Sequence, residues 1–402
     1  MTGAFARLGA HFELGDHNRR LPAMEGLRGL AILLVFVCHY NGIIGEQLHL
    51  PPAIASASKV IGLWGAGGVD LFFLLSGFLI YRSALKHGLN YLAFLRRRLE
   101  RIYPTFLVVF ALYLGLVSLH LAPSRIPLGF VAGGRYLIEN LLFLPGVFDI
   151  RAFIGAAWSL SYEWFFYLAI PLLVHAFQLH RWSRTSRVLF FAGIVVAYVG
   201  IVVAFGSHFP AFAWYDSTRI RMLMFVSGIL VYEVLSSERL SALLTPSREV
   251  ALVAVALAGA VLILIMCAVK SASGSADGEW TAETGTLQVI PTFIACAALA
   301  LVVLRPGGLL AGAFSVNWLR WTGNISYSFY LMHSIPMHIV AVFLTHGPLR
   351  NVNPLIAYVI ALPFTIAFVY VSSAVLFVAV ERPLSLRPRQ SSAASRAQLQ
   401  AA

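Results

Sequence analysis

Charged residues are scarce in this sequence. Only 11% of its 402 residues are charged, whereas 59% are hydrophobic. A soluble domain typically carries about 25% charged residues, because its whole surface faces water. A chain with so little charge can instead have an apolar exterior that faces lipid. The composition therefore excludes an ordinary soluble enzyme and predicts a membrane protein.

Cysteine is also rare. The three cysteines, Cys38, Cys267 and Cys296, all lie within apolar runs, and none has a CxxC spacing. This pattern argues against a disulfide framework or a zinc site and is typical of small packing side chains. No cluster of histidines and carboxylates has the spacing of metal ligands either, so we expect no metal.

The net charge of +12 does not indicate nucleic-acid binding. The basic residues alternate with apolar segments along the chain and do not gather on one soluble face. Arginines and lysines that flank membrane spans usually set the orientation of those spans. We therefore expect the lipid bilayer as the surrounding partner and no nucleic acid.

Apolar runs close to 20 residues long, the length that crosses a bilayer, recur along the chain. They predict an all-α polytopic membrane protein with about ten transmembrane helices. The stretch 136–148 is apolar but short, so it is either a re-entrant or interfacial piece or an eleventh span. The predicted spans are 27–45, 61–80, 104–122, 157–177, 188–205, 219–235, 250–269, 287–304, 325–345 and 354–379.

These spans define one transmembrane domain, which we expect over 27–383. A cytoplasmic N-terminal segment, 1–26, precedes it, and a Ser/Ala-rich, disordered cytoplasmic tail, 384–402, follows it. With the N-terminus inside, most of the 29 basic residues fall in cytoplasmic segments. The positive-inside rule thus predicts a multi-pass protein of the cytoplasmic (inner) membrane with both termini cytoplasmic.

Residues 88–103 predict one further helix, amphipathic and lying at the cytoplasmic membrane surface. Its leucines recur at helical spacing with arginines between them. Pro104 is then expected to begin the next span. Arg97, Arg98 and Arg101 crowd one stripe of this helix. They would either contact lipid headgroups and set topology or form a phosphate clamp, because arginine matches phosphate geometry well.

His39 and Arg28 are an unusual pair on the first span. His39 follows Arg28 by eleven residues, which advance a helix by about 1100°, so both side chains face the same side, about 16 Å apart along the axis. Arg28 would lie at the cytoplasmic surface and His39 near mid-bilayer. An elongated ligand with an anionic head could lie between them; a histidine packed against a helix carbonyl is the alternative.

Four other polar residues within spans are candidates, because ionisable groups in a membrane are costly. Asp70 could complement the dipole at a helix N-terminus, and the Ser76-Gly77 pair allows close helix packing. Glu163, among aromatic residues, needs a partner such as a histidine or an arginine. His333, within the ninth predicted span, fits a structural role when taken alone.

The blocks around these residues resemble the acyltransferase-3 family of bacterial membrane O-acyltransferases. The resemblance runs from Leu21 to about Pro383. One departure is that Pro336 follows His333 by three residues, where family members often have a proline two residues after this histidine. The matching blocks, in order, are 25–31 (EGLRGLA) with His39, 69–78 (VDLFFLLSGF), 98–104 (RLERIYP), 158–163 (WSLSYE), 326–333 (SYSFYLMH) and 381–383 (ERP).

The resemblance implies transfer of an acyl group, usually acetyl, from acyl-CoA to a hydroxyl of a glycan or a lipid-linked sugar. His39 would act as the general base, or would first take the acyl group itself in a two-step route. Glu163 would orient its imidazole or stabilise its charged form. The CoA phosphates would rest on Arg98 and Arg101, with Arg28 as a third candidate. Asp70, Ser76 and His333 would be supporting residues.

Two other classes of function share some of these features. A transporter or flippase for a glycan or small molecule would also place Arg, His and Glu within the membrane, although it would favour paired broken helices. A structural scaffold for a polysaccharide machine would not depend on His39. The sequence carries no signal for the oligomeric state.

Overall fold

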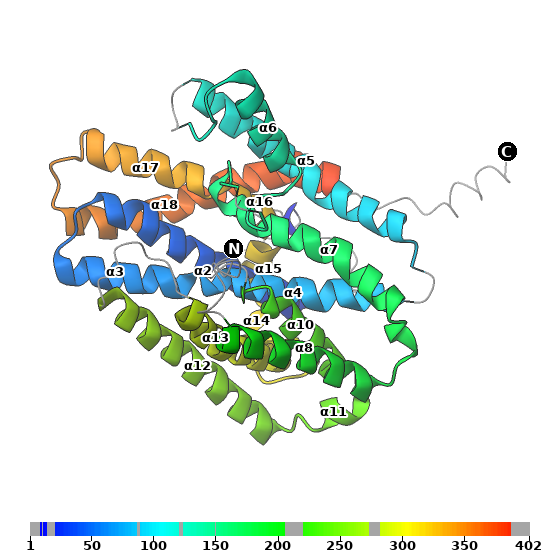
Figure 1. The fold of residues 1–402 in the computed structure, drawn as a ribbon. Helices are drawn as coiled ribbons and strands as arrows, with labels where there is room; N and C mark the ends of the chain where they lie inside the picture. The colour runs from blue at the N-terminus through cyan, green and yellow to red at the C-terminus, as the bar shows by residue number, and fades with distance from the viewer. Residues whose placement is uncertain are drawn as a thin grey trace.

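The computed structural model describes residues 9, 11–13, 21–86, 89–119, 124–148, 150–205, 220–272 and 282–386. Most of the predicted N-terminal segment 1–26 and residues 387–402 of the predicted tail lie outside these ranges. Within them the chain is helical, without a strand, and its long helices run side by side (Figure 1). The helices that matter below are α2 (Pro22–Tyr40), α3 (Pro52–Gly65), α4 (Gly67–Ala84), α5 (Tyr91–Ser118), α6 (Phe130–Leu141), α7 (Trp158–Ala176), α8 (Arg184–Phe205), α10 (Leu223–Leu235), α12 (Pro246–Ala272), α13 (Ala282–Leu304), α15 (Asn317–Asn324), α16 (Ser326–Met332), α17 (Ser334–His346) and α18 (Pro354–Leu376).

The predicted fold class is confirmed, because the described residues form an all-α polytopic membrane protein. Seven helical segments are long and apolar enough to cross a bilayer, and the bent pair α16 and α17 gives up to eight. Two shorter apolar helices, Leu223–Leu235 and Gln288–Leu304, lie where the sixth and eighth spans are predicted. Each of the ten predicted spans therefore coincides with an apolar helix or helix pair.

Two predicted boundaries differ from the structure. The amphipathic segment 88–103 is not a separate helix, because most of it forms the first half of α5. Asn90 caps the N-terminus of α5, where its side chain accepts a hydrogen bond from the Ala93 N–H at 2.9 Å. Pro104 lies inside α5, where we expected a helix start. An internal proline removes one backbone hydrogen bond, a loss that neighbouring groups in a membrane bundle can compensate. Arg98 and Arg101 are consequently fixed on the same helix as the span.

The short apolar stretch 136–148 is not an eleventh span. Its first residues belong to α6, and the rest forms turns with an isolated bridge between Pro145 and Phe148. The exposed side chains at the start of α6 are large and apolar, with Phe130 98% exposed. This agrees with the interfacial interpretation of the stretch, since an amphipathic helix can lie at the membrane surface.

Glycine allows two of the central helices to touch. A Cβ added to Gly77 of α4 would lie 2.0 Å from the carbonyl oxygen of Phe225, and one added to Gly228 of α10 would lie 1.9 Å from that of Leu74. Only glycine fits such contacts, which bring helix backbones together in membrane bundles. The contact fixes α4, and with it the direction of the neighbouring Ser76.

We predicted that Arg28, near the N-terminus of α2, lies at the cytoplasmic surface. This end of α2 packs tightly against α15. A Cβ on Gly323 would lie 1.8 Å from the Glu25 carbonyl oxygen. The buried Arg320 of α15 donates a hydrogen bond from Nε to Glu25 at 3.1 Å. A buried ion pair joined by close backbone packing leaves little freedom for α2, so Arg28 is held in one direction.

The ninth predicted span is broken at His333. Helices α16 and α17 meet there at an angle of 42°. Pro336 has no N–H for the carbonyl of Met332, and prolines at this spacing commonly kink helices. The His333 side chain partly fills the break, because its Nδ1 lies 2.7 Å from the carbonyl oxygen of Tyr330. We predicted one continuous span over 325–345, and the structure corrects this to a bent pair.

Candidate functional site

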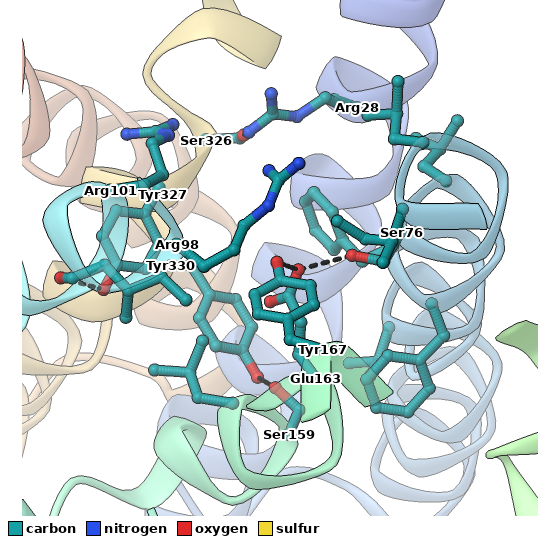
Figure 2. A pocket seen from close by; sticks show the side chains of 18 residues that line it. Arg28, Ser76, Arg98, Arg101, Ser159, Glu163, Tyr167, Ser326, Tyr327 and Tyr330 are labelled. Atoms are coloured by element: carbon teal, nitrogen blue, oxygen red, sulfur yellow. Dashed lines mark hydrogen bonds between the residues drawn. The ribbon is translucent and has the colours of Figure 1, made fainter. Parts of the chain in front are cut away.

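A cavity of about 160 Å³ lies between α2, α4, α5, α7 and α16. Apolar side chains from α4 and α5 line part of its wall, and the rest is rich in arginine and hydroxyl groups. Figure 2 shows three guanidinium groups on one side, the Ser159–Tyr330 pair on the other, and the Glu163 carboxylate between them. The polar lining residues are Arg28, Ser76, Arg98, Arg101, Ser159, Glu163, Tyr167, Ser326, Tyr327 and Tyr330.

Glu163 lies within this cavity as the acceptor of two hydroxyl groups. The Ser76 hydroxyl on α4 and the Tyr167 hydroxyl one turn further along α7 both donate to its Oε1 (Figure 2). A carboxylate inside a membrane bundle is costly without such partners. The contacts explain why the serine of the VDLFFLLSGF block faces Glu163, and they fix the carboxylate in one position.

Arg98 presents its guanidinium to the cavity without a carboxylate partner among the described residues. The guanidinium lies over two rings, 5.2 Å from the centroid of Phe94 and 5.5 Å from that of Tyr167. Its Nε is buried and has no hydrogen-bond partner in the described part of the chain. Cation–π contacts orient an arginine while leaving its N–H groups available. Arg98 can therefore donate to an anion.

Arg101, unlike Arg98, is paired with a carboxylate, although both arginines line the cavity. Its NH1 donates to Glu381 at 2.6 Å, and Glu381 is fully buried. The second oxygen of Glu381 accepts from the backbone N–H and the hydroxyl of Ser328, at 3.1 and 2.5 Å. Glu381 belongs to the π-helical turn Phe377–Ser385 that ends α18. Arg101 thus already has a counter-charge, which joins α5, α16 and α18.

Arg28 completes the cationic side of the cavity. Its NH2 donates to the Ser326 hydroxyl at 3.0 Å, and Ser326 is the first residue of α16. A serine hydroxyl orients a guanidinium without neutralising it, so Arg28 keeps its charge for a ligand. The structure thereby gathers Arg28, Ser76, Arg98, Arg101 and Glu163, five residues predicted from sequence, around one cavity.

His39 lies outside this cavity and beside His333. The two ring centroids are 4.5 Å apart, and the ring planes meet at 70°. Nδ1 of His39 lies 2.9 Å from the carbonyl oxygen of Val35, and Nδ1 of His333 faces the carbonyl of Tyr330. A carbonyl only accepts, so in both neutral rings the proton is assigned to Nδ1 and Nε2 carries the lone pair.

The predicted pairing of Glu163 with His39 is not the geometry observed. No hydrogen bond joins these two side chains, both of which the structure describes. Tyr330 stands between the two groups: it lines the cavity, and its ring lies 6.0 Å from that of His333. Its hydroxyl donates to the carbonyl of Ala156 at 2.7 Å. The cavity and the histidine pair are therefore adjacent sites joined by one fixed tyrosine.

Asp70 is not brought to either group. Its Oδ2 accepts a hydrogen bond from Arg221 at 3.0 Å, and Arg221 also donates to the carbonyl of Ala66 at 3.0 Å. Asp70 lies in the first turn of α4, where a negative charge complements the helix dipole. The observed contacts agree with the structural interpretation of this residue.

Several residues of the site were missed by the sequence analysis. Tyr167 follows Glu163 by four residues, the spacing at which side chains meet on a helix, and this could have identified it. Glu381 was visible only as part of the final block, since its partners Arg101 and Ser328 are far away in the chain. No group of His, Cys, Asp and Glu side chains in the described ranges is arranged to hold a metal ion.

Comparison with protein families gives one match that covers most of the chain. Residues 21–374 match an acyltransferase domain. The chain belongs to the acyltransferase-3 family. This membership agrees with the order of blocks in the sequence and with the all-helical membrane fold.

Curated relatives of this acyltransferase-3 protein come from several bacteria. It is 33% identical over 341 residues to the acyltransferase MdmB of Streptomyces mycarofaciens, covering 78% of each chain. It is 26% identical over 365 residues to the O-acetyltransferase OatA of Staphylococcus aureus, covering 86% of this chain and 55% of that one. It is 25% identical over 335 residues to the putative peptidoglycan O-acetyltransferase YrhL of Bacillus subtilis, covering 79% and 49%.

The chain spans about half the length of the two O-acetyltransferases and most of MdmB. No solved structure matches it. The family and the names of these relatives support an O-acyltransferase embedded in a membrane.

Proposed function

We propose that this protein transfers an acyl group, most simply acetyl, from acyl-CoA to a hydroxyl group of a glycan or lipid-linked sugar, with His39 as the general base. The observation that carries the proposal is the cavity, in which Arg28 and Arg98 keep cationic groups available. It adjoins a histidine pair whose Nε2 atoms are unprotonated in the neutral rings. An anionic donor with a long arm fits this combination.

The donor would bind with its phosphates on Arg98 and Arg28. The cavity of about 160 Å³ is comparable in size to one that admits a benzene-sized molecule. Only the acyl end of the donor and part of its arm would fit inside, so the nucleotide would stay at the arginine side. Arg101 keeps Glu381 as its partner, and its role in our proposal is to hold α5 against α16.

The reaction would be a direct displacement at the thioester. His39 Nε2 accepts the proton of the acceptor hydroxyl while that oxygen attacks the thioester carbonyl carbon. The new C–O bond forms, the C–S bond breaks, and the thiolate takes the proton from His39. Atoms and charge balance without another reactant. Eleven residues of helix separate Arg28 and His39 by roughly 16 Å along α2, which suits a donor that is extended between its phosphates and its thioester.

Glu163 takes a different role in this scheme from the one we predicted. Its contacts with Ser76 and Tyr167 place the carboxylate in the donor cavity, beside Arg98. A carboxylate accepts hydrogen bonds, and the arm of CoA carries amide N–H and hydroxyl donors. We propose that Glu163 orients the donor arm toward the histidine pair, so that it acts on binding and positioning of the donor.

The proposal also includes the orientation of the chain. Both termini and the arginine side of the cavity would face the cytoplasm, where CoA thioesters are made, and the acyltransferase domain would extend over 27–383. The positive-inside distribution of basic residues supports this orientation.

The test uses the purified full chain in detergent, radiolabelled acetyl-CoA and a panel of soluble oligosaccharides. We expect labelled ester in the wild type and its loss in His39→Ala, with unchanged yield and melting temperature. A chain that moves an oligosaccharide across proteoliposomes but never forms an ester would instead be the transporter considered from sequence. A fully active His39→Ala variant would refute the assignment of the base.

A further inference from the structure

A second groove lies at the end of the bundle where α8 begins and α10 ends. Its volume is about 680 Å³, and it runs between the first two turns of α8 and the turn that leads into the short helix α11 (Glu238–Ala242) (Figure 1). Of the residues that the structure describes, none lines both this groove and the cavity around Glu163. The groove is therefore separate from the proposed donor site.

Arginine outnumbers carboxylate at this end of the bundle. Residues 179–187 and 236–248 contain five arginines and one carboxylate, Glu238. An excess of arginine beside membrane spans is typical of the cytoplasmic side. Two of the five arginines, Arg184 and Arg239, line the groove together with Glu238. Two positive charges and one negative charge give the lining a net charge of +1, which favours an anionic ligand.

Arg184 keeps positive charge for a ligand although it lies close to a buried carboxylate. Glu233 of α10 accepts hydrogen bonds from Nε and NH2 of Arg187 at 2.5 and 3.0 Å, so one guanidinium already pairs both of its oxygens. Nε of Arg184 lies 3.3 Å from Glu233 without forming a hydrogen bond, and 37% of the Arg184 side chain is exposed. Two guanidinium groups thus share one negative charge, and the surplus positive charge lies at the groove.

The groove continues into an apolar stripe on the outside of α8. Val188 and Leu189 line the groove one turn beyond Arg184, and Leu189 is 66% exposed. Val196, two turns further along, is 72% exposed and lies on the same face, because seven residues make nearly two full turns. Both residues belong to the predicted span 188–205. The order of charge at the end of the bundle and apolar surface further into the membrane matches a ligand with an anionic head and an acyl chain.

We propose that this groove binds an anionic phospholipid whose headgroup has a net charge of −1. Its phosphate binds Arg184 and Arg239, and one acyl chain lies along the apolar stripe of α8. Arginine donors match phosphate oxygens, and basic pockets between helices at the cytoplasmic surface are typical headgroup sites. The hydroxyls of Thr185 and Ser236, which also line the groove, can bind the hydroxyls of a glycerol headgroup. Only 6% of the most apolar stretch of α8 is buried, so a lipid that contacts both α8 and α11 adds to the contacts that hold this span.

The test titrates the purified full chain in dodecyl maltoside with dioleoylphosphatidylglycerol and follows the melting temperature. A ligand that binds only the folded chain raises the melting temperature in a saturable way. Dioleoylphosphatidylcholine has the same chains and a phosphate but no net charge, and inorganic phosphate has the anion without the chains. We expect a saturable rise with phosphatidylglycerol alone. An equal rise with phosphatidylcholine, or with inorganic phosphate at the same concentrations, would overturn the proposal.

Two variants locate the site. Arg184→Gln and Arg239→Gln should each lower the apparent affinity for phosphatidylglycerol about 5-fold, which is roughly what one arginine near an anionic lipid contributes. Glu233 keeps Arg187 as its partner in both variants, so the fold should be retained.

Arg96→Gln is the matched control. Arg96 is an exposed arginine of α5 that pairs with Glu100 at 2.7 Å and is not among the residues that line the groove. Its replacement should leave the affinity for phosphatidylglycerol unchanged. Unchanged affinity in both Arg184→Gln and Arg239→Gln, or an equal loss in Arg96→Gln, would show that the lipid is attracted by the overall charge of the protein and would refute the site.

Discussion

Arg98 and Arg101 are three residues apart and line the same cavity, yet the structure predicts opposite consequences for their loss. Arg98 forms no salt bridge with a carboxylate among the described residues, so Arg98→Gln removes a ligand contact without breaking an ion pair. A charge-assisted contact to phosphate is worth roughly 1.5–3 kcal/mol. The KM for acetyl-CoA should therefore rise about 10- to 150-fold, most clearly at low salt, with little change in melting temperature.

Arg101→Gln should act mainly on stability. It leaves the fully buried Glu381 without its cation, and breaking a buried ion pair in this way costs about 3–5 kcal/mol. The second substitution, Glu381→Gln, should restore much of that loss, because the buried charge is then gone. Donor titrations and thermal unfolding of the two single variants and the double variant would measure both effects. The reasoning fails if Arg101→Gln raises the donor KM as much as Arg98→Gln does and leaves the melting temperature unchanged.

Three further predictions concern the reaction and the packing. His39→Ala should lower kcat by about 10²- to 10⁴-fold, which single-turnover assays with saturating acetyl-CoA can measure. Adding Glu163→Gln to a partially active His39→Gln variant should multiply the two losses, because the residues do not touch; a double variant no worse than the single one would restore the pairing we predicted from sequence. Gly228→Ala should destabilise the protein by about 1–3 kcal/mol in thermal unfolding, since its Cβ would meet a backbone carbonyl, whereas Gly193→Ala, with open space around it, should not.

The sequence predicts the architecture well, because lipid imposes one simple rule. Every backbone polar group must be satisfied within the bilayer, so apolar runs of sufficient length become helices. The predicted helix boundaries were wrong at positions where this rule allows a helix either to continue or to end. Pro104 can start a helix or lie inside one, and only its tertiary surroundings decide. The 42° break at His333 was missed for a related reason: Pro336 shows that a kink is allowed without fixing its size.

Five of the eight site residues expected from the sequence line one cavity, but the side chains that they contact differ from those expected. Helical spacing predicts that Arg28 and His39 share one side of α2, because that relation is local. Which residues face them depends on how helices pack, and this is determined by contacts such as Gly77 with Phe225 that no spacing reveals. Glu381 could not be assigned to Arg101 from sequence, since 280 residues separate them.

The contacts of Glu163 show what depth arguments leave undetermined. Two residues at similar depth on different helices can meet only if both face the same gap, and depth says nothing about the direction of a side chain. Glu163 faces Ser76 because Gly77 lets α4 pack closely against α10. His39 instead faces His333, at the break between α16 and α17 beside Pro336. The two groups therefore belong to adjacent spaces on either side of Tyr330. In the proposed reaction the donor cavity and the histidine pair are separate sites, so the acyl end of the donor has to pass Tyr330 to reach His39.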